Sequence, residues 1–178
     1  AVDAKPTLVL WVHGLHLSFA NPEYCAIGRA VAARGVAFLS VQTKGHDFGA
    51  WVRGPSGAKL VGSGWEIFTE CLADLGGWLA AARGQGFERI VLVGHGYGAA
   101  KVVFFQAERQ DRGVCAVVVA SSGSLVRDVI DTSQLATAER MVADGHGQDL
   151  MPWGTRRGSL QSSVSAQVYV SHARVHRD

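Results

Sequence analysis

Four stretches of the chain are apolar at nearly every position, and segments with apolar residues at helical spacing lie between and after them. The expected strands are 7–12, 36–42, 89–93 and 114–120, and the expected helices are 22–35, 65–83, 97–110 and 125–143. In this interpretation 44–64 form a long glycine-rich loop, 144–159 are loop-like, and 163–175 are a short strand or an irregular tail.

Strands without polar positions are typical of a parallel sheet that is covered on both faces. Their alternation with helices therefore predicts a three-layer α/β/α sandwich with a mostly parallel sheet of about four or five strands. Right-handed crossovers place the carboxyl ends of all strands at one edge, where open α/β sheets bind ligands. The loops expected at that edge hold His13, His16, His46, His95 and Ser121.

The length of 178 residues and the hydrophobic content of 48% fit a single domain, with a core over 1–124 and a cap-like or C-terminal segment over 125–178. A net charge of +2 without a basic patch argues against nucleic acid or a membrane surface as a partner. Because the chain starts at Ala1, we expect a processed or trimmed N-terminus, and both cytoplasm and periplasm stay open as compartments.

The three cysteines, Cys25, Cys71 and Cys115, are odd in number and lie among apolar neighbours, which predicts buried reduced thiols. No cofactor and no metal are expected. A metal site made of the four histidines at the sheet edge is the weaker alternative, because their spacing lacks the short intervals of ligand motifs.

The strongest chemical signal lies where the strand 89–93 runs into Gly94-His95-Gly96-Tyr97-Gly98 and then directly into a helix. This is the layout of the nucleophile elbow G-x-S-x-G, in which a serine lies at a strained strand-to-helix turn. Gly96 occupies the serine position, so the glycines that shape the turn are kept while the attacking hydroxyl is absent. The competing interpretation is a dinucleotide-binding loop, which needs an acidic residue after the next strand; the chain has Ser121 there.

Two further motifs precede the elbow in the chain, Val12-His13-Gly14 and Lys44-Gly45-His46-Asp47. Together with Gly94–Ala99 they resemble the HG, RGHD-like and GHS-x-G-A motifs of bacterial esterase-like α/β-hydrolases, in the same order and at about the same spacing. The resemblance covers residues 7–123 and implies a truncated α/β-hydrolase core.

The resemblance also implies a binding site for a small ester or acyl compound above Gly96. Its oxyanion hole would use the backbone N–H of Tyr97 and that of Leu15 or a neighbour. The flanking site residues would be His13, Gly14, His95 and Ser121. The catalytic acid and histidine of the family follow two later strands, which the sequence pattern does not contain.

We therefore expect an esterase-type relative that cannot run the serine mechanism as written. It is either a disabled variant or piece of a serine hydrolase, or a natural binding or interaction protein on the same fold; a nucleotide-binding module is the third alternative. The family's strand order places 36–42 and 114–120 at the sheet edges. Because an exposed apolar edge invites pairing, we expect 114–120 to be covered by the C-terminal segment or paired in a homodimer.

Overall fold

A computed structural model of the chain describes residues 6–55, 57–122, 131–152, 156–157, 160–161 and 163–175. The chain divides into two compact units. The sheet unit contains residues 1–43 and 71–123, and the second unit contains residues 44–70 and 124–178. Within the described residues, no helix is both long and apolar enough to cross a membrane.

The sheet unit consists of four strands and three helices. They follow one another as β1 (Thr7–Val12), α1 (Pro22–Ala32), β2 (Ala37–Val41), α2 (Cys71–Gly84), β5 (Arg89–His95), α3 (Tyr97–Arg109) and β6 (Val114–Ala120). All pairings are parallel and the strand order is β2-β1-β5-β6, so β2 and β6 are the edge strands, as expected. The prediction of an α/β fold with a mostly parallel sheet is confirmed.

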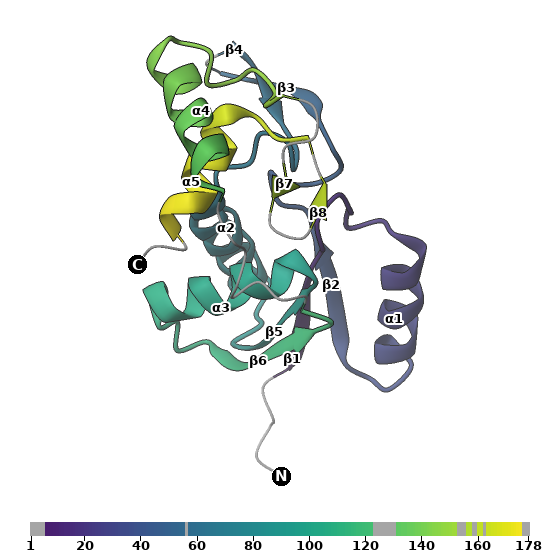
Figure 1. The fold of residues 1–178 in the computed structure, drawn as a ribbon. Helices are drawn as coiled ribbons and strands as arrows, with labels where there is room; N and C mark the ends of the chain where they lie inside the picture. The colour runs from purple at the N-terminus through teal and green to yellow at the C-terminus, as the bar shows by residue number, and fades with distance from the viewer. Residues whose placement is uncertain are drawn as a thin grey trace. The chain divides into compact units, whose positions relative to one another are not determined.

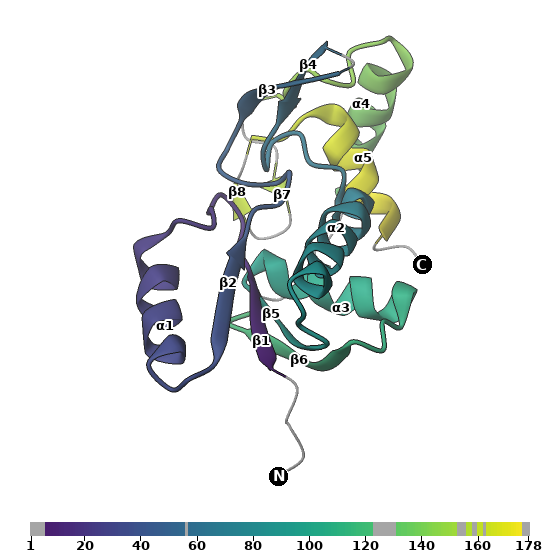
Figure 2. The same ribbon diagram turned by 180° about the vertical axis from the view of Figure 1, so that it is seen from behind.

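The apolar strands are explained by the layers on either side of the sheet. Figures 1 and 2 show α1 on one face and α2 and α3 on the other. In β1, Leu8, Leu10 and Val12 belong to the core under α2 and α3, whereas Val9 and Trp11 belong to the core under α1. Successive side chains of a strand point to opposite faces, so a strand that is covered twice is apolar throughout.

The second unit contains two hairpins and two helices. Their elements are β3 (Ala50–Gly54), β4 (Gly57–Val61), the short 3-10 helix η1 (Phe68–Glu70), α4 (Thr132–Ala143), β7 (Arg156–Arg157), β8 (Leu160–Gln161) and α5 (Ala166–Val175). Helices α4 and α5 pack together through a core that includes Leu135, Ala138, Val168 and Tyr169. This unit thus has an apolar core of its own, and it joins the glycine-rich loop of the sequence to the C-terminal segment.

Three expected elements differ in the structure. The prediction of a strand or irregular tail over 163–175 is wrong, because 166–175 form α5, in which Ala166, Tyr169, Val170 and Ala173 lie at helical spacing in the core of the second unit. The expected loop over 44–64 contains the hairpin of β3 and β4, which lacks an apolar alternation because its side chains are largely exposed; Trp51 is 72% exposed. The helix expected from residue 65 begins only at Cys71, after η1.

The cysteines and the start of α1 need smaller corrections. All three cysteines are free, but only Cys71 is buried, and Cys25 and Cys115 are exposed because they lie on uncovered sides of α1 and β6. Asn21 is the N-cap residue of α1, as expected, yet its side chain makes no bond to the helix. Its Oδ1 instead accepts a hydrogen bond from the Ser18 N–H at 3.0 Å and closes the preceding turn.

Candidate functional site

The turn between β5 and α3 has the strained geometry of an elbow. Gly96 caps α3 with φ 54° and ψ −121°, a conformation that side chains other than glycine adopt only under strain. Its N–H donates to the Ala120 carbonyl at 3.0 Å and ties the ends of β5 and β6 together. The residue at the nucleophile position is thus held at the carboxyl edge of the sheet, at the N-terminus of a helix.

The flanking glycines allow the strand and the helix to approach each other. A Cβ at Gly94 would lie 2.3 Å from the Gly98 carbonyl oxygen, and a Cβ at Gly98 would lie 2.5 Å from the His13 carbonyl oxygen. At Gly96 the nearest atom to a Cβ is the Cα of Gly14, at 3.6 Å. The space above Gly96 is therefore open to a small side chain. It borders the loop that follows β1 and contains His13 and Gly14, which we call the HG loop (residues 13–17).

The HG loop forms a tight turn beside the elbow. The Leu17 N–H donates to the Gly14 carbonyl at 3.2 Å, and His16 has a positive φ of 59°. Leu15 is the residue after Gly14 in this loop. Tyr97 is the first residue of α3, and the backbone N–H groups in the first turn of a helix have no acceptor within the helix itself. Leu15 and Tyr97 therefore follow directly on Gly14 and Gly96, the two glycines that face each other here.

His13 positions this loop from the inside. It is fully buried, its Nε2 accepts from the Thr43 N–H at 3.2 Å, and Nε2 is also 3.0 Å from the Thr43 hydroxyl. The Thr43 hydroxyl accepts from the Lys101 ammonium at 3.1 Å, so its single proton is free to point at His13. The second ring nitrogen of His13, Nδ1, then carries the proton and donates to the Gly14 carbonyl at 2.9 Å. His13 is in this geometry a brace for Gly14.

Lys101 comes from α3 and is only 1% exposed. Its ammonium lies 5.5 Å from the centre of the Tyr97 ring, one helical turn earlier, in addition to its bond to Thr43. A buried cation needs such partners, because losing its hydration is costly. Helix α3 and the HG loop are therefore connected by hydrogen bonds from Lys101 to Thr43 and between Thr43 and His13.

Tyr24 of α1 connects the HG loop to the elbow from the other face. Its hydroxyl accepts from the Gly14 N–H at 3.1 Å and lies 2.8 Å from Nδ1 of His95, the residue before Gly96. Burial raises the pKa of the Tyr24 hydroxyl above its ordinary value, and the hydrogen bond from Gly14 opposes part of that rise. The Tyr24 hydroxyl is therefore held protonated over a wide pH range.

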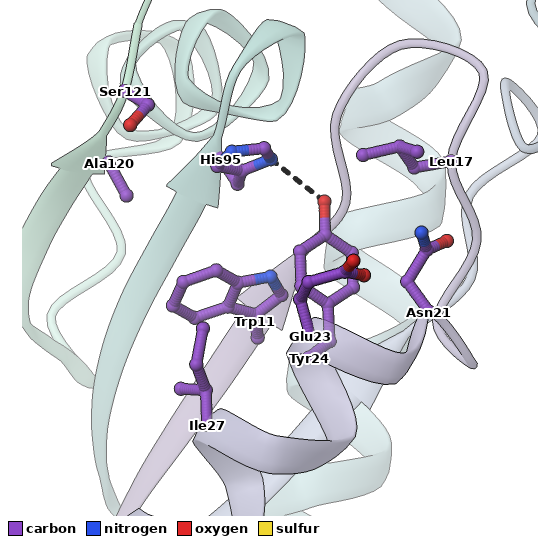
Figure 3. A pocket seen from close by; sticks show the side chains of 9 residues that line it. All are labelled: Trp11, Leu17, Asn21, Glu23, Tyr24, Ile27, His95, Ala120 and Ser121. Atoms are coloured by element: carbon purple, nitrogen blue, oxygen red, sulfur yellow. Dashed lines mark hydrogen bonds between the residues drawn. The ribbon is translucent and has the colours of Figure 1, made fainter.

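A pocket of about 440 Å³ lies on the α1 face of the sheet. His95 and Ser121, which border the elbow, also line this pocket. Figure 3 shows this pocket with the bond between Tyr24 and His95 above the Trp11 indole. The other lining residues are Leu17, Asn21, Glu23, Ile27 and Ala120. Ser121 has a positive φ of 48° at the end of β6 and is exposed.

The Lys44–Asp47 motif belongs to the second unit and is described within it. His46 Nδ1 lies 2.8 Å from Asp47 Oδ2, which makes the pair a local brace of its loop. Gly45 leaves room for a carboxylate, because a Cβ there would overlap the side chain of Glu66, a residue that is only 2% exposed. Among the described residues, no group of three histidine, cysteine or acidic side chains is placed to hold a metal ion.

Sequence reasoning found the motifs but missed the side chains that support them. Lys101, Thr43 and Tyr24 lie outside all three motifs. One signal was present: Lys101 is the only charged residue in the run Tyr97–Phe105, so an apolar helix face there includes a buried cation. Thr43 and Tyr24 carry no comparable signal, because their partners are distant in the chain.

No described protein family matches the chain, and no curated protein matches it either. Solved structures do. A monoacylglycerol lipase from Paleococcus ferrophilus is 17% identical, with 98% of this chain and 69% of that chain covered and a TM-score of 0.65. Est1E from Butyrivibrio proteoclasticus is 16% identical, with 95% of this chain and 61% of that chain covered and a TM-score of 0.61.

The α/β hydrolase GrgF from Penicillium sp. sh18 is 12% identical, with 96% of this chain and 65% of that chain covered and a TM-score of 0.68. The chain thus spans about two thirds of the length of these proteins. At such low identities the likeness concerns the fold alone. The parallel sheet and these structural neighbours agree, and the chain has the fold of these α/β-hydrolases.

Proposed function

We propose that the chain is an esterase-type α/β-hydrolase whose elbow binds a small ester or acyl compound, and in which Gly96 disables serine hydrolysis. The observation that carries this proposal is the conformation of Gly96, the N-cap residue of α3, beside Gly14 of the HG loop. Elbow enzymes hold a substrate carbonyl between the nucleophile and the oxyanion donors at this place. The neighbours include a monoacylglycerol lipase and a protein with bound ferulic acid.

The proposed site polarises a carbonyl without attacking it. The N–H groups of Leu15 and Tyr97 would donate to the carbonyl oxygen, and the N-terminal end of α3 would favour its partial negative charge. Gly96 has no hydroxyl, so no acyl-enzyme can form on it. In serine proteases that lose the triad, oxyanion stabilisation and binding retain a rate enhancement of about 10³–10⁴ over water, which is an upper bound here.

Two forms of this proposal remain to be separated. In the first, the chain is a disabled variant or a piece of a serine hydrolase. In the second, it is a natural binding or interaction protein that uses the same fold. The nucleotide-binding alternative has less support, because β6 ends at Ala120 and Ser121 follows, where ribose binding needs a carboxylate.

Replacement of Gly96 by serine separates the two forms. The variants Gly96→Ser and Gly96→Ala add the same Cβ into the same open space, and only the first adds a hydroxyl. Each is treated with a fluorophosphonate probe and assayed with p-nitrophenyl butyrate. Labelling and hydrolysis by Gly96→Ser alone would show that a histidine and an acid are in place. Absence of both in a folded Gly96→Ser protein would favour the binding protein.

Binding itself is tested on the unchanged chain. Because Gly96 cannot be acylated, p-nitrophenyl butyrate should bind without rapid turnover and shift the backbone amide NMR signals of Leu15 and Tyr97. The amide signals of the β3–β4 hairpin serve as an internal reference, since that hairpin belongs to the second unit. If neither Leu15 nor Tyr97 responds at millimolar ester, the elbow does not bind esters and the proposed function is wrong.

A further inference from the structure

The pocket on the α1 face is lined by neither Gly96 nor Tyr97. Its walls come from β1, α1, the loop before α1 and the ends of β5 and β6, whereas α3 starts at Tyr97 and packs into the core on the opposite face. The volume of about 440 Å³ lies within the range of small-molecule sites. The pocket can therefore be considered by itself.

The hydrogen bonds around Tyr24 determine which group His95 offers to a ligand. The Tyr24 hydroxyl is buried and already accepts from the Gly14 N–H, so its own proton needs an acceptor. His95 Nδ1 at 2.8 Å provides that acceptor. This arrangement places the imidazole proton on Nε2, on the side of the ring away from Tyr24 in Figure 3. In this tautomer His95 offers Nε2–H to a ligand as a hydrogen-bond donor.

The walls of the pocket carry no positive charge, and besides His95 and Tyr24 their polar groups are the Trp11 indole N–H and the side chains of Asn21, Glu23 and Ser121. Trp11, Ile27 and Ala120 provide flat and aliphatic surface, and neither lysine nor arginine lines the pocket. Its acidic side chain, Glu23, is exposed. Asn21 Oδ1 is already occupied by the Ser18 N–H. An anion would meet the Glu23 carboxylate without a compensating cation. A cation could pair with Glu23, but this carboxylate is exposed, so water and salt screen the attraction, and the cation would also meet the His95 donor.

We propose that this pocket is a binding site for a neutral, flat small molecule with one carbonyl-type acceptor, which lies against Trp11 and accepts from His95 Nε2–H. Amides, ketones and uncharged esters share this chemistry. The inference does not rest on the function proposed for the elbow, because the ligand contacts neither Leu15 nor Tyr97. A failure of ester binding at the elbow would leave it unaffected.

The test compares three ligands that are planar, carry one benzene ring and have nearly the same shape: benzamide, benzoate and benzamidinium. Binding is followed through the indole N–H signal of Trp11 in ¹H–¹⁵N NMR spectra, assigned by its loss in Trp11→Phe. We expect benzamide to bind with a dissociation constant in the millimolar range and both ions to bind at least tenfold more weakly. Stronger binding of either ion, or no response to benzamide, would overturn the proposal.

A filled pocket provides the second arm. Ala120→Leu adds bulk to the wall at the end of β6, and Ile27→Phe does so from α1, so the test does not depend on one variant folding. Val118→Leu is the matched control, because Val118 lies on the same face of β6 two residues earlier and does not line the pocket. We expect both filling variants to lose benzamide binding and the control to keep it. Equal binding by all of them would place benzamide elsewhere.

Discussion

At the scale of single residues, the glycines of the elbow differ in what a methyl group would meet. Gly94→Ala would press a Cβ against the Gly98 carbonyl, whereas Gly96→Ala would meet nothing closer than 3.6 Å. The first variant forces the backbone apart, and the second only adds the strain of a positive φ. We expect a loss of about 1–2 kcal/mol for Gly96→Ala and about 3 kcal/mol or more for Gly94→Ala. Urea unfolding measures both, and equal losses would contradict the elbow geometry.

Tyr24 of α1 is the residue that connects the HG loop to the elbow. In Tyr24→Phe the Gly14 N–H loses its buried acceptor and His95 loses its partner, which should lower the free energy of unfolding by about 1–2 kcal/mol. Tyr169→Phe is the matched control, since its hydroxyl bonds Gln134 in the second unit and leaves Gly14 untouched. Amide NMR signals of Gly14 and Leu15 should shift in the first variant alone.

The raised pKa of Tyr24 adds a pH dependence with a defined sign. Its hydroxyl has a higher pKa in the folded than in the unfolded chain, where the ordinary value is 10.0. The folded state therefore holds the proton more tightly, and this stabilisation is present below about pH 10 and is lost as the pH rises through the folded value. The stability difference between the unchanged protein and Tyr24→Phe should shrink above pH 10. A constant difference up to pH 11 would refute this.

At the scale of elements, an ion pair fastens the end of α2 to the loop between α3 and β6. Arg83 bonds the Asp111 carboxylate, which also accepts from the Gly113 N–H at 2.9 Å. The bond from Arg83 is the main reason why the pKa of Asp111 lies below its ordinary value of 3.8. The carboxylate form is therefore favoured in the folded state.

Asp111→Asn should cost about 1 kcal/mol at neutral pH, a modest value because Arg83 is 40% exposed. A lowered pKa stabilises the protein above the ordinary value and loses this effect as the pH falls through the folded value. The difference in unfolding free energy from the unchanged protein should thus be full at pH 6 and should begin to close as the pH falls below 3.8. Glu108→Gln, an exposed change on α3, is the control and should show no such closing. Urea unfolding across this pH range checks the prediction.

The elements themselves differ in how far the sequence predicts them. Strands β1, β2, β5 and β6 were predictable because a doubly covered strand is apolar throughout. The β3–β4 hairpin and α5 were not: the hairpin buries little apolar surface, and the β-branched valines of α5 favour a strand until its contacts with α4 are known. Local pattern cannot reveal an element whose stability comes from a partner elsewhere.

The same division holds for the candidate site. The elbow and the HG loop follow from short motifs, because glycine spacing is local information. The bonds from Lys101 to Thr43 and from Tyr24 to His95 join residues 58 and 71 positions apart, and no spacing rule connects them. Thus the backbone of the site was predictable, and the side chains that hold it were not.

At the scale of the whole molecule, the exposed edge of the sheet at β6 is open to pairing with another strand. Strand β6 pairs only with β5 among the described residues, and Val118 is 43% exposed. Its sequence, Val114–Ala120, contains neither a charge nor a proline to prevent pairing. A strand that is uncovered in this way offers backbone donors and acceptors to another strand.

We propose that two copies pair through this edge. A two-fold axis beside β6 would let the two copies of the strand satisfy each other's backbone hydrogen-bonding groups with the same surface. Analytical ultracentrifugation at tens of micromolar should then give twice the 18.9 kDa of the chain. Val118→Lys should yield monomers, since lysine on an edge strand opposes pairing. Val103→Lys places the same charge on an exposed position of α3 and should remain dimeric. A monomeric unchanged chain at that concentration, or a dimer that survives Val118→Lys, would show that β6 is not the contact.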